Sequence, residues 1–258
     1  AKHAQKNGKA SKAAPSLFTS YKGGMENLVD GVVGALTGDL RLNAMLCALR
    51  EMPDGGFELT LRDGEHLHAD RVILALPAYQ TANLLEPLCP EATALLNAIP
   101  YVDTGTVSLV YRIEDIPVPL DGFGMVVPRS EKRQINAITV SSTKFDGRAP
   151  GNLVLMRVFF GGARTPHVYD MTDDGIIETV QRELQDITGV TACPLVTRVV
   201  RNPRATPQYD VGHLDRIAAA ESGLPDGLHL AGSAYYGVGV PDCVHQSQLV
   251  VERLANSR

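Results

Sequence analysis

Hydrophobic positions at helical spacing occur in two stretches of the first 100 residues. In residues 25–36, apolar side chains recur at i, i+3, i+4 and i+7, and the pattern ends at Thr37-Gly38. Residues 81–99 also carry apolar residues at helical spacing, although Pro87 and Pro90 interrupt them. We expect a helix in each stretch. The predicted buried positions are Met25, Leu28, Val29, Val32, Val33, Leu36, Leu84, Leu85, Leu95 and Leu96.

The second half of the chain contains stronger helix signals. Thr172 is a suitable N-cap, and Gly189 is a suitable end for the helix that follows it. A short helix is predicted around residues 214–219, and a last one begins near Pro241, since proline is favoured in the first helical turn. The predicted buried positions are Ile176, Ile177, Val180, Leu184 and Ile187 in the capped helix, and Cys243, Ser247, Val250 and Leu254 in the last one.

Short apolar or alternating runs, separated by turn signals, predict strands between the helices. Residues 107–160 contain several such runs in succession, which favours an antiparallel sheet, and the segment 202–226 is predicted to be loop apart from its short helix. Together with a covering helix, this order indicates an α+β fold with a mixed, largely antiparallel sheet. The predicted strands are 40–42, 46–49, 57–61, 71–76, 107–111, 124–127, 135–140, 153–160 and 195–200.

A glycine-rich turn lies between the strand Leu228-His229-Leu230 and the last helix. Its glycines, Gly232, Gly237 and Gly239, allow sharp bends or close approach of a ligand to the backbone. The N–H groups at the helix start could donate to a phosphate, a carboxylate or a ring carbonyl. The same pattern is also typical of a strand–turn–helix unit that binds nothing.

Composition and charge reduce the number of functions that the sequence supports. The 258 residues carry a net charge of −5, which makes nucleic acid an unfavoured partner. Residues 1–17 are rich in Lys, Ala, Gly and Ser and predict a disordered arm or linker. The four cysteines are far apart and favour reduced thiols in the cytoplasm. With no Gly-x-Ser-x-Gly, carboxylate pair or metal-ligand spacing, the sequence offers no candidate catalytic side chain or metal site.

Four blocks, in order along the chain, resemble the protoporphyrinogen oxidase family. The string Leu-x-Leu-Ala-Gly…Tyr-x-Gly-Val-Gly-Val-Pro-Asp-Cys at residues 228–243 is similar to the C-terminal flavin signature of that family. The others are Ser20-Tyr21-Lys22-Gly23-Gly24-Met25, Gly122-Phe123-Gly124 followed by Pro128, and Pro207-Gln208-Tyr209 with Gly212-His213.

The resemblance implies FAD as cofactor and two structural parts. Residues 18–100 and 211–258 would form part of the FAD-binding domain, and residues 101–210 the substrate-binding domain. The sequence contains no Gly-x-Gly-x-x-Gly, the fingerprint that seats the FAD pyrophosphate. We therefore expect this chain to be the C-terminal part of a longer protein, with a missing N-terminal segment as its partner.

The resemblance also assigns residues to ligands, position by position. It places the cofactor against the glycine-rich turn and against the backbone of Leu46. It places the substrate against Phe123 and Val126 on one side of its ring and Phe159 on the other. The residues implied to contact FAD are Leu46, Gly232, Ser233, Val238, Gly239 and Val240.

The implied reaction is the oxidation of protoporphyrinogen IX by hydride transfer to FAD, with oxygen as the final acceptor. Asn202, where the family has an aromatic residue before the Pro-Gln-Tyr block, leaves coproporphyrinogen III open as the substrate. Two further alternatives are a non-catalytic module and another flavin amine oxidase relative. We expect a cytoplasmic location, and an apolar substrate is compatible with weak peripheral association with the inner face of the membrane.

Overall fold

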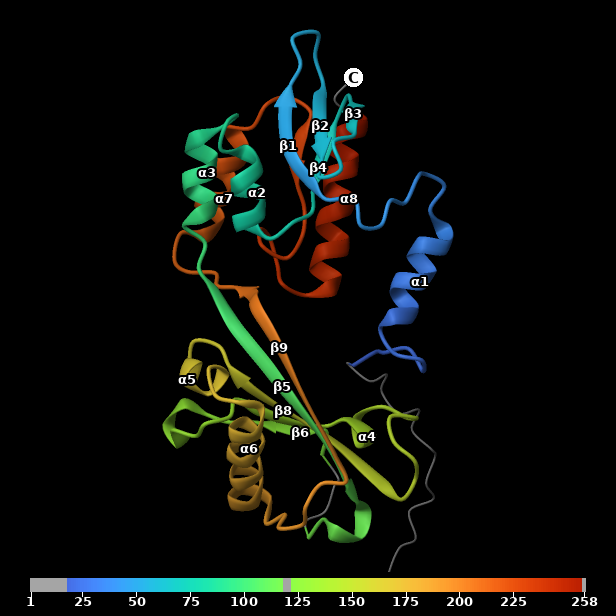
Figure 1. Cartoon of the computed structure of the whole chain (residues 1–258), viewed down its shortest axis with the longest axis vertical. Coiled ribbons are helices and arrows are strands. Elements are labelled where there is room, and N and C mark those ends of the chain that lie inside the picture. The colour runs from blue at the N-terminus through green and yellow to red at the C-terminus, as the bar shows by residue number, and fades with distance from the viewer. Residues whose placement is uncertain (1–17, 118–121, 257–258) are drawn as a thin grey trace, which may run out of the picture.

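The computed structural model describes residues 18–117 and 122–256, so the arm predicted for residues 1–17 lies outside the described residues. The described chain forms two lobes, joined by two long strands (Figure 1). We call the first the helix lobe. It comprises β1 (Leu46–Glu51), β2 (Phe57–Leu61), β3 (His66–Ala69), β4 (Val72–Leu74), α2 (Ala78–Leu85), α3 (Pro90–Asn97), α7 (His213–Ser222), β10 (Leu228–Leu230) and α8 (Val240–Asn256).

We call the second the sheet lobe, and its central feature is a five-stranded antiparallel sheet in the order β6-β7-β8-β5-β9. Short helical turns at Ile113–Asp115 and Arg129–Glu131 lie in its loops. It comprises β5 (Tyr101–Arg112), β6 (Gly124–Val126), β7 (Ala137–Val140), α4 (Ser141–Lys144), β8 (Leu153–Gly161), α5 (Pro166–Tyr169), α6 (Asp173–Thr188) and β9 (Val196–Pro207).

The core of the sheet lobe lies between α6 and one face of this sheet. Alternate residues of β5 and β8 are buried there, including Leu109 and Met156, and they share a cluster with Ile176, Val180 and Leu184 of α6. Each such side chain contributes about 1.5–3 kcal/mol by leaving water. The side chains on the other face of the same strands are only partly buried or exposed, which leaves that face open.

In the helix lobe, a separate core holds α2, α3 and α7 against two short parallel strands, β4 and β10. The antiparallel sheet β1-β2-β3 packs beside them. With antiparallel sheets and covering helices in both lobes, the predicted α+β class is confirmed.

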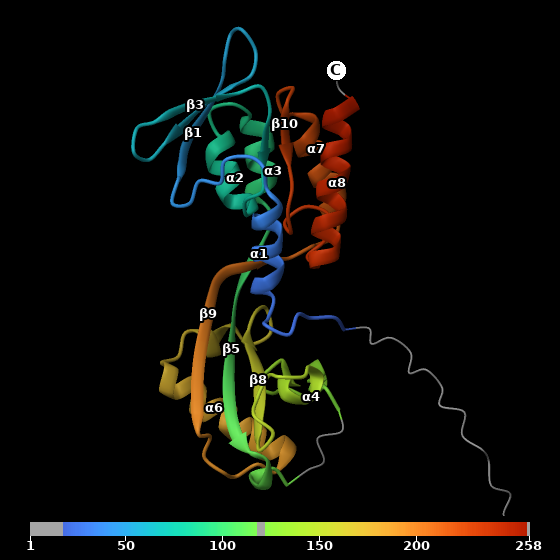
Figure 2. The same cartoon turned by 90° about the vertical axis from the view of Figure 1, so that its right-hand side faces the viewer.

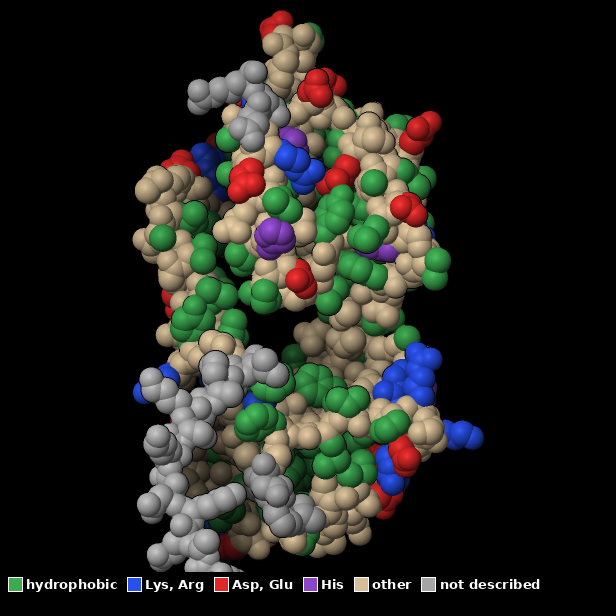
Figure 3. Space-filling view, turned by 180° about the vertical axis from the view of Figure 1, so that it is seen from behind, with side chains coloured by type: hydrophobic (Ala, Val, Ile, Leu, Met, Phe, Trp, Pro, Cys, Tyr) green, Lys and Arg blue, Asp and Glu red, His purple; other side chains and the backbone are tan. Residues whose placement is uncertain are grey.

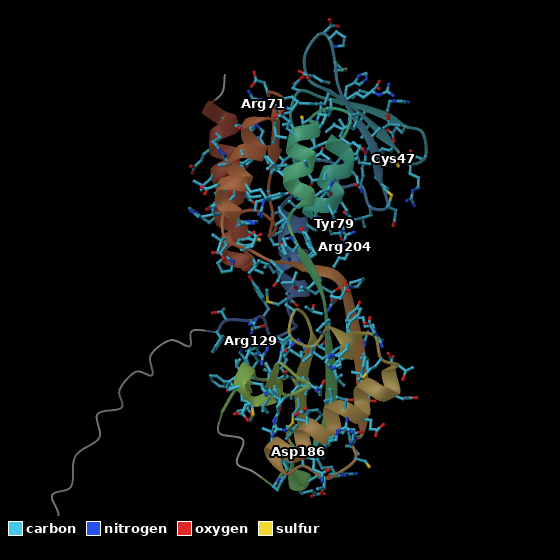
Figure 4. The ribbon with its side chains drawn as sticks, turned by 90° about the vertical axis from the view of Figure 1, so that its left-hand side faces the viewer. Cys47, Arg71, Tyr79, Arg129, Asp186 and Arg204 are labelled. Carbon is cyan, nitrogen blue, oxygen red and sulfur yellow. The ribbon has the colours of Figure 1, made fainter. Side chains whose placement is uncertain are left out.

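Strands β5 and β9 connect the lobes. Their pairing extends to Tyr101 opposite Pro207, and Gln208 N–H then donates to the carbonyl of Pro100 at 2.8 Å. The Arg204 guanidinium lies 3.6 Å from the centre of the Tyr79 ring in α2, as the two labelled residues in Figure 4 show. These contacts fix the start of the chain segment that returns to the helix lobe.

The structure corrects three predictions about secondary structure. Residues 202–207, predicted to be loop, continue β9, because the first residues of β5 offer a free strand edge. A bulge at Val102/Thr104 accommodates Arg204 at φ +44° and the preceding proline, which has no N–H to donate. Residues 40–42 form no strand, and the helical pattern at 81–99 divides into α2 and α3.

The helix predicted at residues 25–36 forms as α1 (Glu26–Ala35), but it has no buried residue. Its apolar stripe, including Val29 and Val32, is exposed, since none of the described residues covers it. Figure 2 shows α1 beside the two lobes rather than within either core. None of the described helices is both long and apolar enough to cross a lipid bilayer.

Helix α6 shows both predicted end signals. Thr172 Oγ1 accepts a hydrogen bond from Gly175 N–H at 3.2 Å, and Gly189 ends the helix at φ +73°. We predict that Thr172→Ala destabilises the protein by about 1 kcal/mol, the usual cost of losing an N-cap. Urea unfolding followed by circular dichroism measures this. Thr143→Ala, an exposed site in α4, is the control, and equal stability of the two variants would contradict the capping assignment.

Candidate functional site

The glycine-rich turn joins β10 to α8, and its glycines serve different purposes. A Cβ added at Gly237 would lie 2.5 Å from the Cβ of Asp242, and one at Gly239 would lie 2.8 Å from Asp242 Oδ2. These two glycines therefore make room for Asp242, which caps α8 by accepting from Gly239 N–H at 3.2 Å. Gly232, at φ +114°, faces open space within 4 Å, so a ligand could approach its backbone.

Tyr209 holds this turn from the end of β9. Its hydroxyl donates to the carbonyl of Ser233 and accepts from Gly237 N–H, both at 2.8 Å. Its ring stacks on His213 with centroids 3.8 Å apart. Burial raises the pKa of Tyr209, so the hydroxyl stays protonated and able to donate at neutral pH.

His213 and Tyr235 fasten the same turn to the helix lobe. His213 is buried, and its Nε2 lies 3.0 Å from the carbonyl of Tyr235, which requires the Nε2–H tautomer. The Tyr235 hydroxyl is 3.0 Å from Thr81 Oγ1 and donates to the carbonyl of Leu76 at 3.2 Å. Burial raises the pKa of Tyr235 far above its ordinary value, so this donor also keeps its proton.

Sequence reasoning did not identify what these tyrosine and histidine side chains do. The resemblance gave neither Tyr209 nor His213 a role. The Pro-Gln-Tyr-x-x-Gly-His block was the available signal, but nothing in it shows that Tyr209 reaches a turn 24 residues away along the chain. The fixed turn is the structural result of that contact.

An open apolar groove of about 860 Å³ begins at the turn and runs along α8. It brings together three of the residues predicted to contact the cofactor, Ser233, Val238 and Val240, while Gly232 and Gly239 lie in the same turn. Val238 and Val240 are more than half exposed. The other lining residues include Cys243, Val244, Ser247, Gln248 and Val251.

Among the described residues, no hydrogen-bond acceptor pairs with the backbone N–H of Val238 or of Val240. Donors of this kind at a helix start favour a carbonyl or an anion. The Asp242 carboxylate lies beside them, however, and its charge opposes that of a phosphate. The arrangement therefore suits the polar edge of a neutral, flat heterocycle better than a phosphate group.

Leu46 lies apart from this groove. It begins β1 opposite Leu61 and packs against the core of the helix lobe. In Figure 4 the adjacent Cys47 is labelled on the side of the helix lobe away from α8. The structure thus does not bring Leu46 together with the glycine-rich turn, and its predicted contact with the cofactor stays a prediction.

The residues predicted to contact substrate lie on the sheet lobe. Val126 pairs with Ala137, and Ala137 pairs with Phe159, so all three side chains share the open face of the sheet. With neighbouring strands about 4.8 Å apart, Val126 and Phe159 stand about 10 Å from one another across the small Ala137. This slot could hold a flat ring on edge, with one of the two side chains on each side. Phe123, by contrast, meets the ring of Phe18 edge-on at 6.0 Å.

Figure 3 shows the surface between the two lobes to be hollowed, with hydrophobic side chains of the sheet lobe gathered below the hollow. Lys and Arg side chains gather at its side. The molecule thus presents an apolar surface with a cationic border to the space between its lobes.

The hydrogen bonds of Tyr209 can be tested directly. We predict that Tyr209→Phe, which keeps the ring but removes the hydroxyl, speeds hydrogen exchange of the Gly237 amide about tenfold, equivalent to about 1.4 kcal/mol of lost protection. Tyr79→Phe is the matched control, because its ring contacts do not involve its hydroxyl. Unchanged exchange at Gly237 in Tyr209→Phe would contradict the role given to Tyr209.

Comparison with known proteins identifies the family to which this chain belongs. The family model described as flavin containing amine oxidoreductase matches residues 2–255. The chain is 35% identical over 241 residues to a coproporphyrinogen III oxidase of Propionibacterium freudenreichii subsp. freudenreichii, covering 91% of this chain and 44% of that protein. It is 31% identical to the chloroplastic protoporphyrinogen oxidase of Nicotiana tabacum, with 87% and 44% covered.

A crystal structure from Exiguobacterium sp. 255-15, described as a protoporphyrinogen oxidase, superposes with a TM-score of 0.82 at 30% identity. The match covers 93% of this chain and 52% of that one. The chain thus spans about half the length of the relatives it matches. Because the family model extends over nearly the whole sequence, the chain belongs to the flavin containing amine oxidoreductase family.

Proposed function

We propose that this chain supplies the flavin-facing turn and the substrate-facing sheet of an FAD-dependent oxidase whose substrate is a porphyrinogen, protoporphyrinogen IX in the first instance. The observation that carries the proposal is that one chain presents two suitable surfaces, the glycine-rich turn and the open face of the sheet. The turn offers free amides beside an apolar groove, and the open sheet face offers the slot between Val126 and Phe159. Relatives at about 30% identity are porphyrinogen oxidases by name.

The residues of this chain fit one part of FAD. The open backbone at Gly232 and the free amides of Val238 and Val240 suit the isoalloxazine ring and its polar edge. The pyrophosphate needs a glycine fingerprint, and this sequence contains none. When bound, FAD would supply the acceptor for a hydride from a methylene bridge of the substrate, and oxygen would be reduced to hydrogen peroxide as it reoxidises the flavin.

The protein's contribution would be position and electrostatics. Tyr209 and Asp242 fix the turn, so that the amides of Val238 and Val240 need no reorganisation to donate to the polar edge of the ring. Val126 and Phe159 would hold an apolar macrocycle and exclude water from it. Such a substrate is compatible with a cytoplasmic protein that contacts the membrane surface only peripherally.

The test joins this chain to the half of the Exiguobacterium protein that it does not cover. We predict that the joined protein oxidises protoporphyrinogen IX in air, measured by the fluorescence of the porphyrin formed. Coproporphyrinogen III is assayed in parallel as the alternative substrate. Retention of FAD without turnover of either porphyrinogen would contradict the proposal.

The slot is tested in the same protein. Phe159→Ala should lower kcat/KM about tenfold, equivalent to about 1.4 kcal/mol of lost contact with the substrate. Val200→Ala is the control, because Val200 shares the open face but lies at the opposite edge of the sheet. Equal kcat/KM for the parent and Phe159→Ala would exclude Phe159 from the substrate site.

A further inference from the structure

A pocket lined by basic side chains lies on the sheet lobe and takes no part in the site described above. It has a volume of about 470 Å³ and opens to solvent. Two loops form it, the one that joins β6 to β7 and the one that follows β8. Its polar lining includes Arg129, Lys132, Arg133, Gln134, Arg164 and His167.

The contacts of this pocket are with α6, the helix that covers the core face of the sheet. Arg133 forms ion pairs with Glu183 at 3.0 Å and with Asp186 at 3.4 Å, and both carboxylates belong to α6. Gln134 N–H donates to the other carboxylate oxygen of Glu183 at 2.9 Å. Because α6 packs on the core face and the proposed substrate slot lies on the open face, these contacts separate the pocket from the slot.

Most of the positive charge in this pocket has no counter-ion in the protein. Within residues 18–117 and 122–256, no carboxylate lies within 4.0 Å of the cationic groups of Arg129, Lys132 or Arg164. The nearby Glu131 is among the carboxylates that form no such pair. Arg164 is also partly buried, so water hydrates its charge less fully than that of an exposed arginine. An anionic ligand would relieve the repulsion between these cations.

The pocket also contains hydrogen-bond donors that the protein leaves unused. Gln134 Oε1 accepts from His167 Nε2, and the side-chain N–H groups of Gln134 have no acceptor among the described residues. Arg164 donates through Nη1 to the carbonyl of Val127 at 2.7 Å, which leaves its other N–H groups for a ligand. Donors from both loops therefore surround the pocket, an arrangement that suits an anion with several oxygen atoms.

Hydrogen bonds hold the first of these loops in place before a ligand binds. The N–H of Lys132 donates to the carbonyl of Arg129 at 3.2 Å, and Lys132 ends the short helical turn at φ +51°. The bonds of Arg133 and Gln134 to Glu183 anchor the residues that follow. The basic side chains thus extend from an ordered backbone, which lowers the entropy cost of binding.

We propose that this pocket binds the phosphate group of a soluble phosphate monoester, as a second ligand site that does not depend on the proposed function. Three unpaired cations balance a doubly charged phosphate better than the single charge of one carboxylate. The oxygens of a phosphate point in tetrahedral directions, so they can accept from donors on both loops at once. A carboxylate holds its two oxygens in one plane, which a single guanidinium already satisfies. The volume of about 470 Å³ leaves room for part of the esterified molecule.

The test uses this chain as it is, because the whole pocket lies within it. Glycerol 3-phosphate is titrated into the chain at neutral pH and followed by calorimetry. It should bind with a Kd of about 1 mM or less, and added salt should raise that Kd. Glycerol, which lacks the phosphate, and succinate, a dicarboxylate used at matched ionic strength, should bind at least about tenfold more weakly. No binding of glycerol 3-phosphate, or equal binding of either comparison compound, would overturn the proposal.

Substitutions assign the binding to the pocket. The double variant Arg129→Gln/Lys132→Gln should weaken binding of glycerol 3-phosphate about tenfold, the sum of two exposed ion pairs with the ligand. Both residues are exposed, so the variant should keep the circular dichroism spectrum of the parent. The double variant Arg50→Gln/Arg62→Gln removes the same charge from exposed positions in the helix lobe and should leave the affinity unchanged. An equal loss in the two double variants, or no loss in the first, would overturn the proposal.

A lipid headgroup also carries phosphate, and sedimentation with vesicles of phosphatidylglycerol distinguishes it from a soluble ester. The two double variants should sediment with these vesicles to the same extent. Weaker sedimentation of Arg129→Gln/Lys132→Gln than of Arg50→Gln/Arg62→Gln would assign the pocket to a lipid surface and overturn the proposal. Since the proposed function is judged by turnover of a porphyrinogen in the joined protein, its failure and the failure of the phosphate site are separate results.

Discussion

The pairing of β5 with β9 is the interaction on which the arrangement of both lobes depends. The two strands share a ladder from Val110 opposite Val196 to Tyr101 opposite Pro207, so they belong to the sheet lobe and also form its connection to the helix lobe. The ladder ends at Pro207, so the residues that follow it lie next to the glycine-rich turn. Tyr209 then bonds to both sides of that turn through one hydroxyl.

Local signals were enough to predict the elements whose ends the sequence itself encodes. Thr172 and Gly189 mark α6 because an N-cap hydroxyl and a left-handed C-cap are properties of single residues. Residues 202–207 could not be predicted in the same way. Their strand exists because β5 offers an edge about 100 residues away along the chain, and two prolines in the segment argue locally for a loop.

The candidate site also has parts that local residues predict and parts that depend on distant strand pairing. The glycine-rich turn was predictable from its residues, although the reason for Gly237 and Gly239 proved to be the Asp242 side chain. The row of Val126, Ala137 and Phe159 required the register of three strands, which no local pattern supplies. Helix α1 shows another limit of local prediction. Periodicity correctly predicted its apolar face, but it could not predict whether another part of the protein covers that face.

The central claim is that the turn between β10 and α8 faces the flavin ring. The most direct measurement is hydrogen exchange of backbone amides in the joined protein, with FAD bound and after FAD is removed. The account predicts slower exchange at Val238 and Val240 when FAD is bound, while exposed amides of β3 stay unchanged. Stoichiometric FAD binding that leaves exchange at Val238 and Val240 unaltered would contradict it.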